Sequence, residues 1–279
     1  MTFRRVHVHV QIVGLNRSLS FTGPSIVKQV ITPLDRCPLL KLSTSMTLIR
    51  PPGKVVNERS GESGLTEKEV VPPLDRVPCS FLDQSVLEER TAGSWSDVVS
   101  QGDPFVDGGK SIGFALIYLS ALQGSANVVP GSPDVVVVLR PDIEIRGRLW
   151  VAARALWMFI LARYRNVSAM LPAWGNYGGY NDRFAILSGQ AAAEYLTRLD
   201  SIPQWHETGQ PFDPESFLKF VMKDRVVKKS IYTPMVRIRI GGRAESRDLA
   251  FFTESSVKAR FRNRTMSVAR SIRSLFRRF

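Results

Sequence analysis

The sequence predicts an α/β protein in which a mixed, mainly parallel β-sheet is flanked by helices. Residues 135–139 are four valines and a leucine, an unbroken apolar run typical of a strand that is buried on both faces. Residues 6–13 alternate between apolar and polar side chains, which indicates a second strand. Apolar segments at residues 110–123 and 149–164 have the length and spacing of helices, and strands between helices fit a βαβ layout.

The end of the valine-rich run is where a binding site is expected. Arg140-Pro141-Asp142-Ile143-Glu144 follows it, and Pro141 cannot donate to a sheet, so the chain turns away there. In open α/β sheets, ligands bind just beyond the carboxyl ends of central strands. Arg140, Asp142 and Glu144 are therefore candidate ligand contacts, although charged residues at a strand end are also common without a ligand.

The first predicted strand, Val6–Val13, places His7, His9 and Gln11 on the face opposite its apolar residues. Both histidines point the same way, as metal ligands would. His206 is the only other histidine in the chain, so a hydrogen-bonded or half-exposed pair is the favoured interpretation.

A turn and a helix follow the first strand. The turn is Gly14-Leu15-Asn16-Arg17-Ser18, and a helix is predicted from Pro24 on, with Thr22 or Gly23 as its N-cap. A strand, a glycine turn and a helix commonly contact a phosphate or nucleotide. The segment lacks the three-glycine dinucleotide fingerprint and the P-loop lysine, so these two classes are excluded. Arg17 could bind a diphosphate through two hydrogen bonds or simply lie on the turn.

The middle of the chain is less informative. Leu40–Ile49 is a predicted strand and Leu82–Glu89 a predicted short helix. Residues 50–70 are rich in proline, glycine, serine and charge, which is typical of a mobile surface loop.

A glycine- and aromatic-rich loop over residues 172–180 precedes a predicted strand, Asn181–Leu187, and a predicted helix over residues 189–199. Glycines let the backbone approach a ligand, and Trp174, Tyr177 and Tyr180 offer faces for stacking on a sugar or base. A tight structural loop is the alternative.

Two further elements are predicted near the carboxyl end. Asp213 caps a helix over Pro214–Val221, with Pro214 at its first position. Met235–Ile240 alternates as a late strand, in which Arg237 and Arg239 share a face turned toward phosphate or solvent.

The formal charge is +13, from 38 Lys+Arg and 25 Asp+Glu, which favours anionic partners without choosing among nucleotides, nucleic acid and lipid. Residues 257–279 carry many arginines, no acid and one apolar helical stripe. Such a basic amphipathic helix favours contact with an anionic membrane surface or a partner. Nucleic acid is less favoured because the chain has no zinc-finger or RNA-recognition signature.

The sequence indicates a cytoplasmic protein, with its basic tail as the only feature that would hold it peripherally at a membrane. Cys37 and Cys79 form no metal or redox spacing and are typical of reduced thiols. The apolar segment near the start is too short and interrupted for a signal peptide, and no apolar run reaches a transmembrane length.

Taken together, these segments resemble glycosyltransferases of the polysaccharide-biosynthesis type, which have a GT-A-like, Rossmann-type nucleotide-sugar fold. The resemblance covers most of Val6–Gly242, and its most specific parts are Arg140-Pro141-Asp142 and Asn181-Asp182-Arg183-Phe184-Ala185. It implies one catalytic domain over residues 1–248 and leaves the basic tail, residues 249–279, outside that domain.

The resemblance also implies the residues that contact the nucleotide-sugar donor. They are Gly14, Arg17, Ser18, Arg140 and Asn181. Of these, Arg17 and Arg140 would contact phosphate, because a guanidinium group matches phosphate oxygens with paired hydrogen bonds.

The implied reaction moves a sugar from that donor to a glycan or other hydroxyl acceptor. A divalent ion or arginines must neutralise the leaving diphosphate. Mn²⁺ or Mg²⁺ held by Asp142 and Glu144 would suit this task, with a glutamate in place of a second aspartate. Asp182 is the candidate base for the acceptor hydroxyl, and Asp142 and Arg183 complete the predicted catalytic residues.

Two other classes of function remain open. The chain could be a basic nucleic-acid- or membrane-binding protein, as its charge and tail suggest. It could also be an inactive glycosyltransferase-like protein that keeps the fold for interaction, because fold does not entail function.

Overall fold

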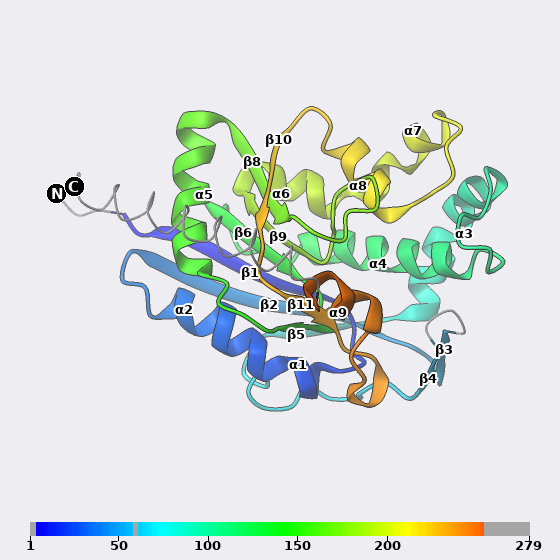
Figure 1. Cartoon of the computed structure of the whole chain (residues 1–279), viewed down its shortest axis with the longest axis horizontal. Coiled ribbons are helices and arrows are strands. Elements are labelled where there is room, and N and C mark those ends of the chain that lie inside the picture. Colours follow the sequence, from blue (N-terminus) through cyan, green and yellow to red (C-terminus); the bar gives the residue numbers. More distant parts are fainter. Residues whose placement is uncertain (1–3, 58–60, 254–279) are drawn as a thin grey trace.

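The computed structural model describes residues 4–57 and 61–253. Its centre is a seven-stranded sheet of order β10-β8-β9-β6-β1-β2-β5 (Figure 1). The strands are β1 (Val6–Leu15), β2 (Leu40–Arg50), β5 (Cys79–Asp83), β6 (Val135–Leu139), β8 (Val167–Pro172), β9 (Phe184–Ser188) and β10 (Val226–Ile231). Of these, β9 alone runs antiparallel to its neighbours, which confirms the predicted mixed, mainly parallel sheet.

Helices cover both faces of the sheet (Figure 1). The helices of one face are α1 (Leu19–Ile26), the π-helical segment Val27–Ile31, α2 (Thr32–Asp35) and α5 (Val151–Arg165). The helices of the other are α3 (Gln84–Ser100), α4 (Lys110–Ala126), α6 (Gly189–Leu196), α7 (Ile202–His206) and α8 (Pro214–Val221). Each layer buries its apolar side chains against the sheet, which confirms the predicted α/β class.

Smaller elements lie beside the main sheet. They are the antiparallel pairs β3 (Val55–Asn57) with β4 (Glu62–Gly64) and β7 (Ile143–Ile145) with β11 (Met235–Arg237), and the helix α9 (Ser246–Thr253). The predicted loop over residues 50–70 therefore contains a short hairpin. The predicted strand over residues 235–240 is shorter than expected, because the chain leaves β7 after Arg237.

The central strand β1 has one apolar and one polar face, as its alternation predicts. Val8, Val10 and Ile12 are fully buried in the core beneath α1 and α5. On the opposite face His9 is also buried, and its ring nitrogens lie 3.0 Å from the hydroxyl oxygens of both Ser43 and Ser45 on β2. The favoured interpretation of His9 as a hydrogen-bonded side chain is therefore confirmed.

The prediction that the first helix starts near Pro24 is wrong. The helix α1 begins at Leu19, directly after the turn, and Pro24 lies inside it. Thr22, expected as a cap, is instead buried in the helix, where its hydroxyl donates to the carbonyl of Pro141 at 2.5 Å. Proline has no N–H for the helical hydrogen bond, and the chain continues as a π-helical segment after it.

At the carboxyl end, α9 spans the domain boundary that we predict at residue 248. Its Phe251 and Phe252 rings lie 6.0 and 5.0 Å from the ring of Trp174. The basic segment over residues 257–279, for which we predict a membrane or partner contact, lies outside the described residues. Within the described part of the chain, no helix is long and apolar enough to cross a membrane.

Candidate functional site

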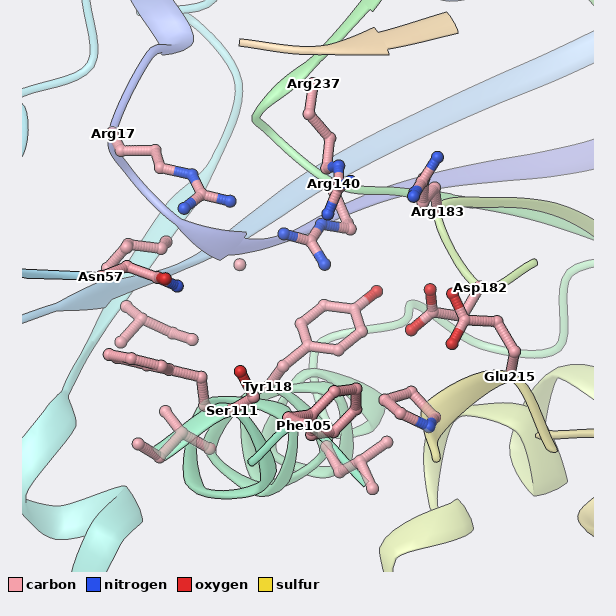
Figure 2. A pocket seen from close by; sticks show the side chains of 18 of the residues that line it. Arg17, Asn57, Phe105, Ser111, Tyr118, Arg140, Asp182, Arg183, Glu215 and Arg237 are labelled. Carbon is pink, nitrogen blue, oxygen red and sulfur yellow. The ribbon is translucent and has the colours of Figure 1, made fainter. Parts of the chain in front are cut away.

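A cavity of about 720 Å³ opens at the edge of the sheet where β1, β2 and β6 end (Figure 2). Because β9 runs the opposite way, its start lies at this same edge and brings Asp182 and Arg183 to the cavity. The backbone N–H of Arg140, just after β6, donates to the carbonyl of Arg183 at 3.3 Å. The structure therefore joins the two most specific sequence motifs in one pocket, at the position expected for a ligand in an α/β sheet.

Gly14 lets β1 approach the turn after β6. Its φ of +143° is a conformation that side-chain-bearing residues rarely adopt, and an added Cβ would lie 3.0 Å from Cδ of Pro141. The backbone of β1 can therefore line the pocket directly at this point.

Three arginines from separate segments form one side of the pocket, which we call the arginine wall. Arg17 follows β1, Arg140 follows β6, and Arg237 ends β11. Figure 2 shows their guanidinium groups directed toward the pocket from the same side. The sequence left Arg237 open between phosphate and solvent, and the structure places it in the pocket.

Asp142 lies behind the arginine wall, with 2% of its surface exposed. Arg140 donates to both of its carboxylate oxygens, at 2.9 Å from Nε and 2.8 Å from Nη2, and Arg17 donates to Oδ2 from Nε and Nη2. Burial alone would raise the pKa of Asp142, but the charges of Arg140 and Arg17 outweigh it and hold that pKa well below its usual range. Asp142 is thus an ionised brace for two guanidinium groups.

Two further buried carboxylates brace the wall from behind. Glu62, on β4, accepts a hydrogen bond from Nη1 of Arg17 at 2.8 Å, and Asp248, on α9, accepts one from Nε of Arg237 at 3.0 Å. Glu62 lies in the segment that the sequence predicts as a loop, and yet it is 3% exposed. Distant parts of the chain therefore fix the positions of the arginines.

Asp182 and Glu215 lie at another side of the pocket, and we call them the carboxylate pair (Figure 2). Asp182 comes just before β9 and lies 3.8 Å from Nη2 of Arg198. Glu215 is in the first turn of α8, where its carbonyl accepts from the N–H of Tyr180 at 2.8 Å. Burial, with the nearby charges of Asp182 and Asp213, raises the pKa of Glu215 to about 8, so this residue holds a proton at neutral pH.

The hydroxyl of Tyr118 lies between the arginine wall and the carboxylate pair (Figure 2). Tyr118 is 7% exposed, and its hydroxyl has no hydrogen-bond partner among the described residues. Burial, with a contribution from Tyr195 and Asp182, raises its pKa, so the phenol remains protonated and can donate. A buried polar group without a partner in a pocket is a sign that a ligand supplies one.

The residues for which we predict a metal do not fit a divalent ion. Both oxygens of Asp142 are occupied by guanidinium groups, and Glu144 forms an ion pair with Arg146 at 2.7 Å. Within residues 4–57 and 61–253, no group of three or more histidine, cysteine, aspartate and glutamate side chains is placed to hold a metal. A cation at Asp142 would have to displace at least one arginine.

Two other predicted donor contacts have structural partners. The Ser18 hydroxyl donates to the carbonyl of Ile238 at 2.8 Å and is fully buried. The Asn181 amide donates to the carbonyl of Trp174 at 2.8 Å, and its oxygen accepts the N–H of Arg183. Neither side chain lines the pocket, so both position the residues beside them.

Several pocket residues were not predicted as functional from the sequence. They are Tyr118, Arg198 and Glu215. Tyr118 lies within a helix that its sequence predicts as core, and Glu215 looks like an ordinary first-turn acid of a capped helix. A signal was present for Tyr118, because Ser111, Ala115 and Tyr118 share one helical face that is not wholly apolar.

No protein-family model matches the chain, and no curated protein matches it at a significant level. Solved structures align with parts of the chain. Mouse xyloside xylosyltransferase 1, in its apo form, aligns over 80% of this chain and 84% of its own, with 10% identity and a TM-score of 0.39.

A galactosyltransferase, LgtC, in complex with donor and acceptor sugar analogs, aligns over 80% of this chain and 73% of its own, with 10% identity and a TM-score of 0.43. An active-site mutant of LgtC aligns over 76% and 69%, with 12% identity and a TM-score of 0.40. The chemistry of this chain depends on the residues of its own pocket.

Proposed function

We propose that the chain is a glycosyltransferase that moves a sugar from a nucleotide-sugar donor to a hydroxyl group of a glycan or other acceptor. One observation carries this proposal. A single pocket joins the arginine wall to the carboxylate pair, with the Tyr118 hydroxyl between them. A nucleotide sugar has the matching order of groups, an anionic diphosphate followed by a neutral sugar that is rich in hydroxyls.

The pocket has room and suitable surfaces for the whole donor. Its volume of about 720 Å³ lies within the ordinary range for small-molecule sites. Ile49, Val55 and Phe114 line the part of the pocket formed by β2, β3 and α4 and offer apolar contacts to a nucleoside. The arginine wall offers charged donors to the diphosphate, because guanidinium groups bind phosphate oxygens through paired hydrogen bonds.

In a direct displacement, a base near the acceptor and positive charge near the leaving group both assist the transfer. In the proposed step, the acceptor oxygen forms a bond to the anomeric carbon while the bond from that carbon to the phosphate oxygen breaks. Asp182 takes the proton of the acceptor hydroxyl. The electron pair of the broken bond remains on the diphosphate, next to Arg17 and Arg140.

Glu215 and Tyr118 then have a positioning role in the same step. Protonated Glu215 and the Tyr118 phenol donate hydrogen bonds to sugar oxygens, whereas the oxygens of Asp182 accept the proton of the acceptor hydroxyl. The geometry supports this division because the three side chains line the same pocket and burial keeps both protons in place.

The substitution Asp182→Asn tests this assignment. It keeps the shape of the side chain and removes the base, so we expect the rate of sugar transfer to fall by about 10²–10⁴-fold. Affinity for the nucleoside diphosphate should change little, because the arginine wall is intact. Both quantities are measured with a panel of UDP-, GDP-, CDP- and ADP-sugars, by product chromatography for transfer and by calorimetry for binding.

The matched control is Asp200→Asn, which alters an exposed aspartate that bonds Gln123 outside the pocket. It should behave like the wild-type protein. If the wild-type protein bound none of the four nucleoside diphosphates, or if Asp182→Asn transferred sugar at the wild-type rate, the proposal would be wrong.

A further inference from the structure

We propose that the arginine wall binds the donor's diphosphate directly and neutralises it without a divalent ion. This inference rests on the proposed function, and it specifies how the same pocket recognises its substrate. It departs from the metal site that the sequence predicts at Asp142 and Glu144. The acids near the wall are already occupied by arginines.

Asp142 is the only predicted metal ligand in contact with the wall, and its carboxylate is saturated by cations. Arg140 holds both of its oxygens in a two-pronged arrangement at 2.9 and 2.8 Å, and Arg17 adds a hydrogen bond from Nε to Oδ2 at 3.1 Å. One negative charge therefore faces two positive charges. A divalent ion at coordination distance would meet two guanidinium groups at close range, and the repulsion opposes its binding.

The second predicted ligand, Glu144, is part of a different contact. Its carboxylate accepts a hydrogen bond from Nε of Arg146 at 2.7 Å. It lies on β7, and it does not line the pocket. Two carboxylates that each hold an arginine, one of them outside the pocket, do not make the oxygen cage that Mg²⁺ or Mn²⁺ requires.

The remaining acids behind the wall are occupied in the same way. Glu62 accepts from Arg17 at 2.8 Å and from Arg239 at 3.1 Å, and Asp248 accepts from Arg183 at 2.9 Å and from Arg237 at 3.0 Å. Among the described residues, each acid that contacts the wall thus bridges two arginines. The arrangement holds guanidinium groups in fixed positions, and its acids are turned away from the pocket.

The arginines keep donors for a ligand. Arg140 and Arg237 each bond their carboxylate through Nε and Nη2, so among the described residues Nη1 of each has no partner. Their side chains are 23% and 20% exposed, and both line the pocket. Two braced cations with donors toward one cavity match the adjacent phosphates of a nucleoside diphosphate. The bracing also reduces the ordering that binding would otherwise require.

Calorimetric titration of the full-length wild-type protein with UDP, GDP, CDP and ADP tests the inference. Each titration is made in EDTA and again with Mn²⁺ or Mg²⁺, and Mn²⁺ is also titrated alone. We expect the best nucleotide to bind with the same Kd in all conditions, within about twofold, and Mn²⁺ alone to show no site. If the Kd improved about tenfold or more with the metal, and binding vanished in EDTA, the metal-free site would be wrong while the proposed function would survive.

Charge-conserving variants separate the two schemes further. Arg140→Lys and Arg237→Lys keep the charge and lose the paired N–H donors of the guanidinium group. Each should therefore weaken nucleotide binding by about tenfold or more in EDTA. Glu144→Gln should leave nucleotide binding unchanged. If Glu144 were a metal ligand, the same substitution would weaken the metal-dependent binding of the nucleotide. Arg146→Lys is the control, because this arginine lies outside the pocket and pairs with Glu144.

These outcomes distinguish the failure of the inference from the failure of the proposed function. Absence of binding by any nucleotide, with or without metal, would overturn both. Metal-dependent binding that is lost in Glu144→Gln would overturn only the inference. Unchanged affinity in both arginine variants would also overturn the inference, because the diphosphate would then lie elsewhere.

Discussion

At the scale of single residues, two acids in and behind the pocket have pKa values shifted in opposite directions by their surroundings. Asp142 faces two guanidinium groups and is held ionised, with its pKa well below the usual range. Glu215 is half-buried beside Asp182 and Asp213, and partial burial and these two charges raise its pKa to about 8. One acid is therefore fixed as a charge and the other as a proton donor, and this difference gives Glu215 a measurable pH dependence.

The substitution Glu215→Gln should change how stability depends on pH. The folded protein keeps the proton of Glu215 up to a pKa of about 8, whereas the unfolded chain releases it near its usual value. The folded state binds more protons in this window, so the free energy of unfolding should fall as the pH rises from about 5 to about 9. Glutamine cannot ionise, so the variant should lack this contribution to the fall in stability. Urea unfolding across the pH range measures the difference.

The same residue should set the alkaline limit of activity. Loss of its proton adds a second negative charge beside Asp182, and transfer should decline in the wild-type protein around pH 8. Glu207→Gln, at an exposed acid, is the control and should follow the wild-type curve. If the free energy of unfolding of the wild-type protein and of Glu215→Gln changed equally with pH, the raised pKa of Glu215 would be contradicted.

At the scale of elements, the carboxylate pair depends on the contact between the 172–180 loop and α8. The N–H of Tyr180 donates to the carbonyl of Glu215 at 2.8 Å, and the Asp213 side chain caps α8 by accepting from the N–H of Ser216 at 2.9 Å. Gly179 makes this approach possible, since a Cβ there would lie 1.9 Å from the Glu215 carbonyl oxygen.

The substitution Gly179→Ala should therefore push the start of α8 away from the loop. We expect a loss of about 1–3 kcal/mol of unfolding free energy and a large loss of sugar transfer, because Glu215 moves with the helix. Denaturant unfolding and transfer assays measure both effects. Gly93→Ala is the control, since it lies in α3 with nothing within 4 Å and should raise stability by about 0.5–1 kcal/mol. A Gly179→Ala protein as stable as the wild type would show that this contact does not hold α8.

Elements whose local apolar pattern fits only one type of secondary structure could be predicted from the sequence. The helix over residues 110–123 and the strand over residues 135–139 are found nearly as expected, because their apolar runs have one interpretation at that length. The strands β5, β8 and β10 could not be predicted. β10, at an edge of the sheet, includes Lys228 and Lys229, and edge strands carry such charges without an alternating pattern.

At the scale of the whole molecule, the site combines segments that no local pattern relates. The sequence alone predicts that the ends of β1 and β6 lie close together, because parallel strands place their carboxyl ends at one edge of the sheet. Glu62 could not be placed behind Arg17, because the two lie 45 residues apart. Asp248 could not be placed between Arg237 and Arg183, because Arg183 lies 65 residues away. The surroundings of the predicted metal ligand Asp142 could not be foreseen for the same reason, since the sequence does not show which cations reach it.

The sheet also contains a buried polar row that affects the stability of the whole domain. His9 bonds Ser43 and Ser45, and Gln11 donates to Thr47 at 3.3 Å, all on the face beneath α4. Burial lowers the pKa of His9 and His7 adds to this effect, while the bond to Gln11 opposes it. His9 is therefore neutral in the folded protein.

The substitution His9→Gln should make stability less sensitive to acid. The unfolded chain binds a proton at His9 below about pH 6.5, whereas the folded protein resists it, so wild-type stability should fall as the pH drops below that value. The variant should be less stable at neutral pH, because it loses a well-placed ring, and its stability should fall less on acidification. Thermal unfolding between about pH 5 and pH 8 measures both. Identical acid slopes would contradict a neutral buried His9.

The reversed direction of β9 has a consequence for how such a protein can diverge. The arginines of the wall follow β1 and β6 or end β11. Asp182 lies in the loop before β9, and Glu215 lies in α8. Insertions or exchanges in that loop can remodel the side of the pocket that carries Asp182 without shifting the register of the sheet. Under the proposed function, such changes would alter the acceptor and leave the nucleotide-sugar donor the same.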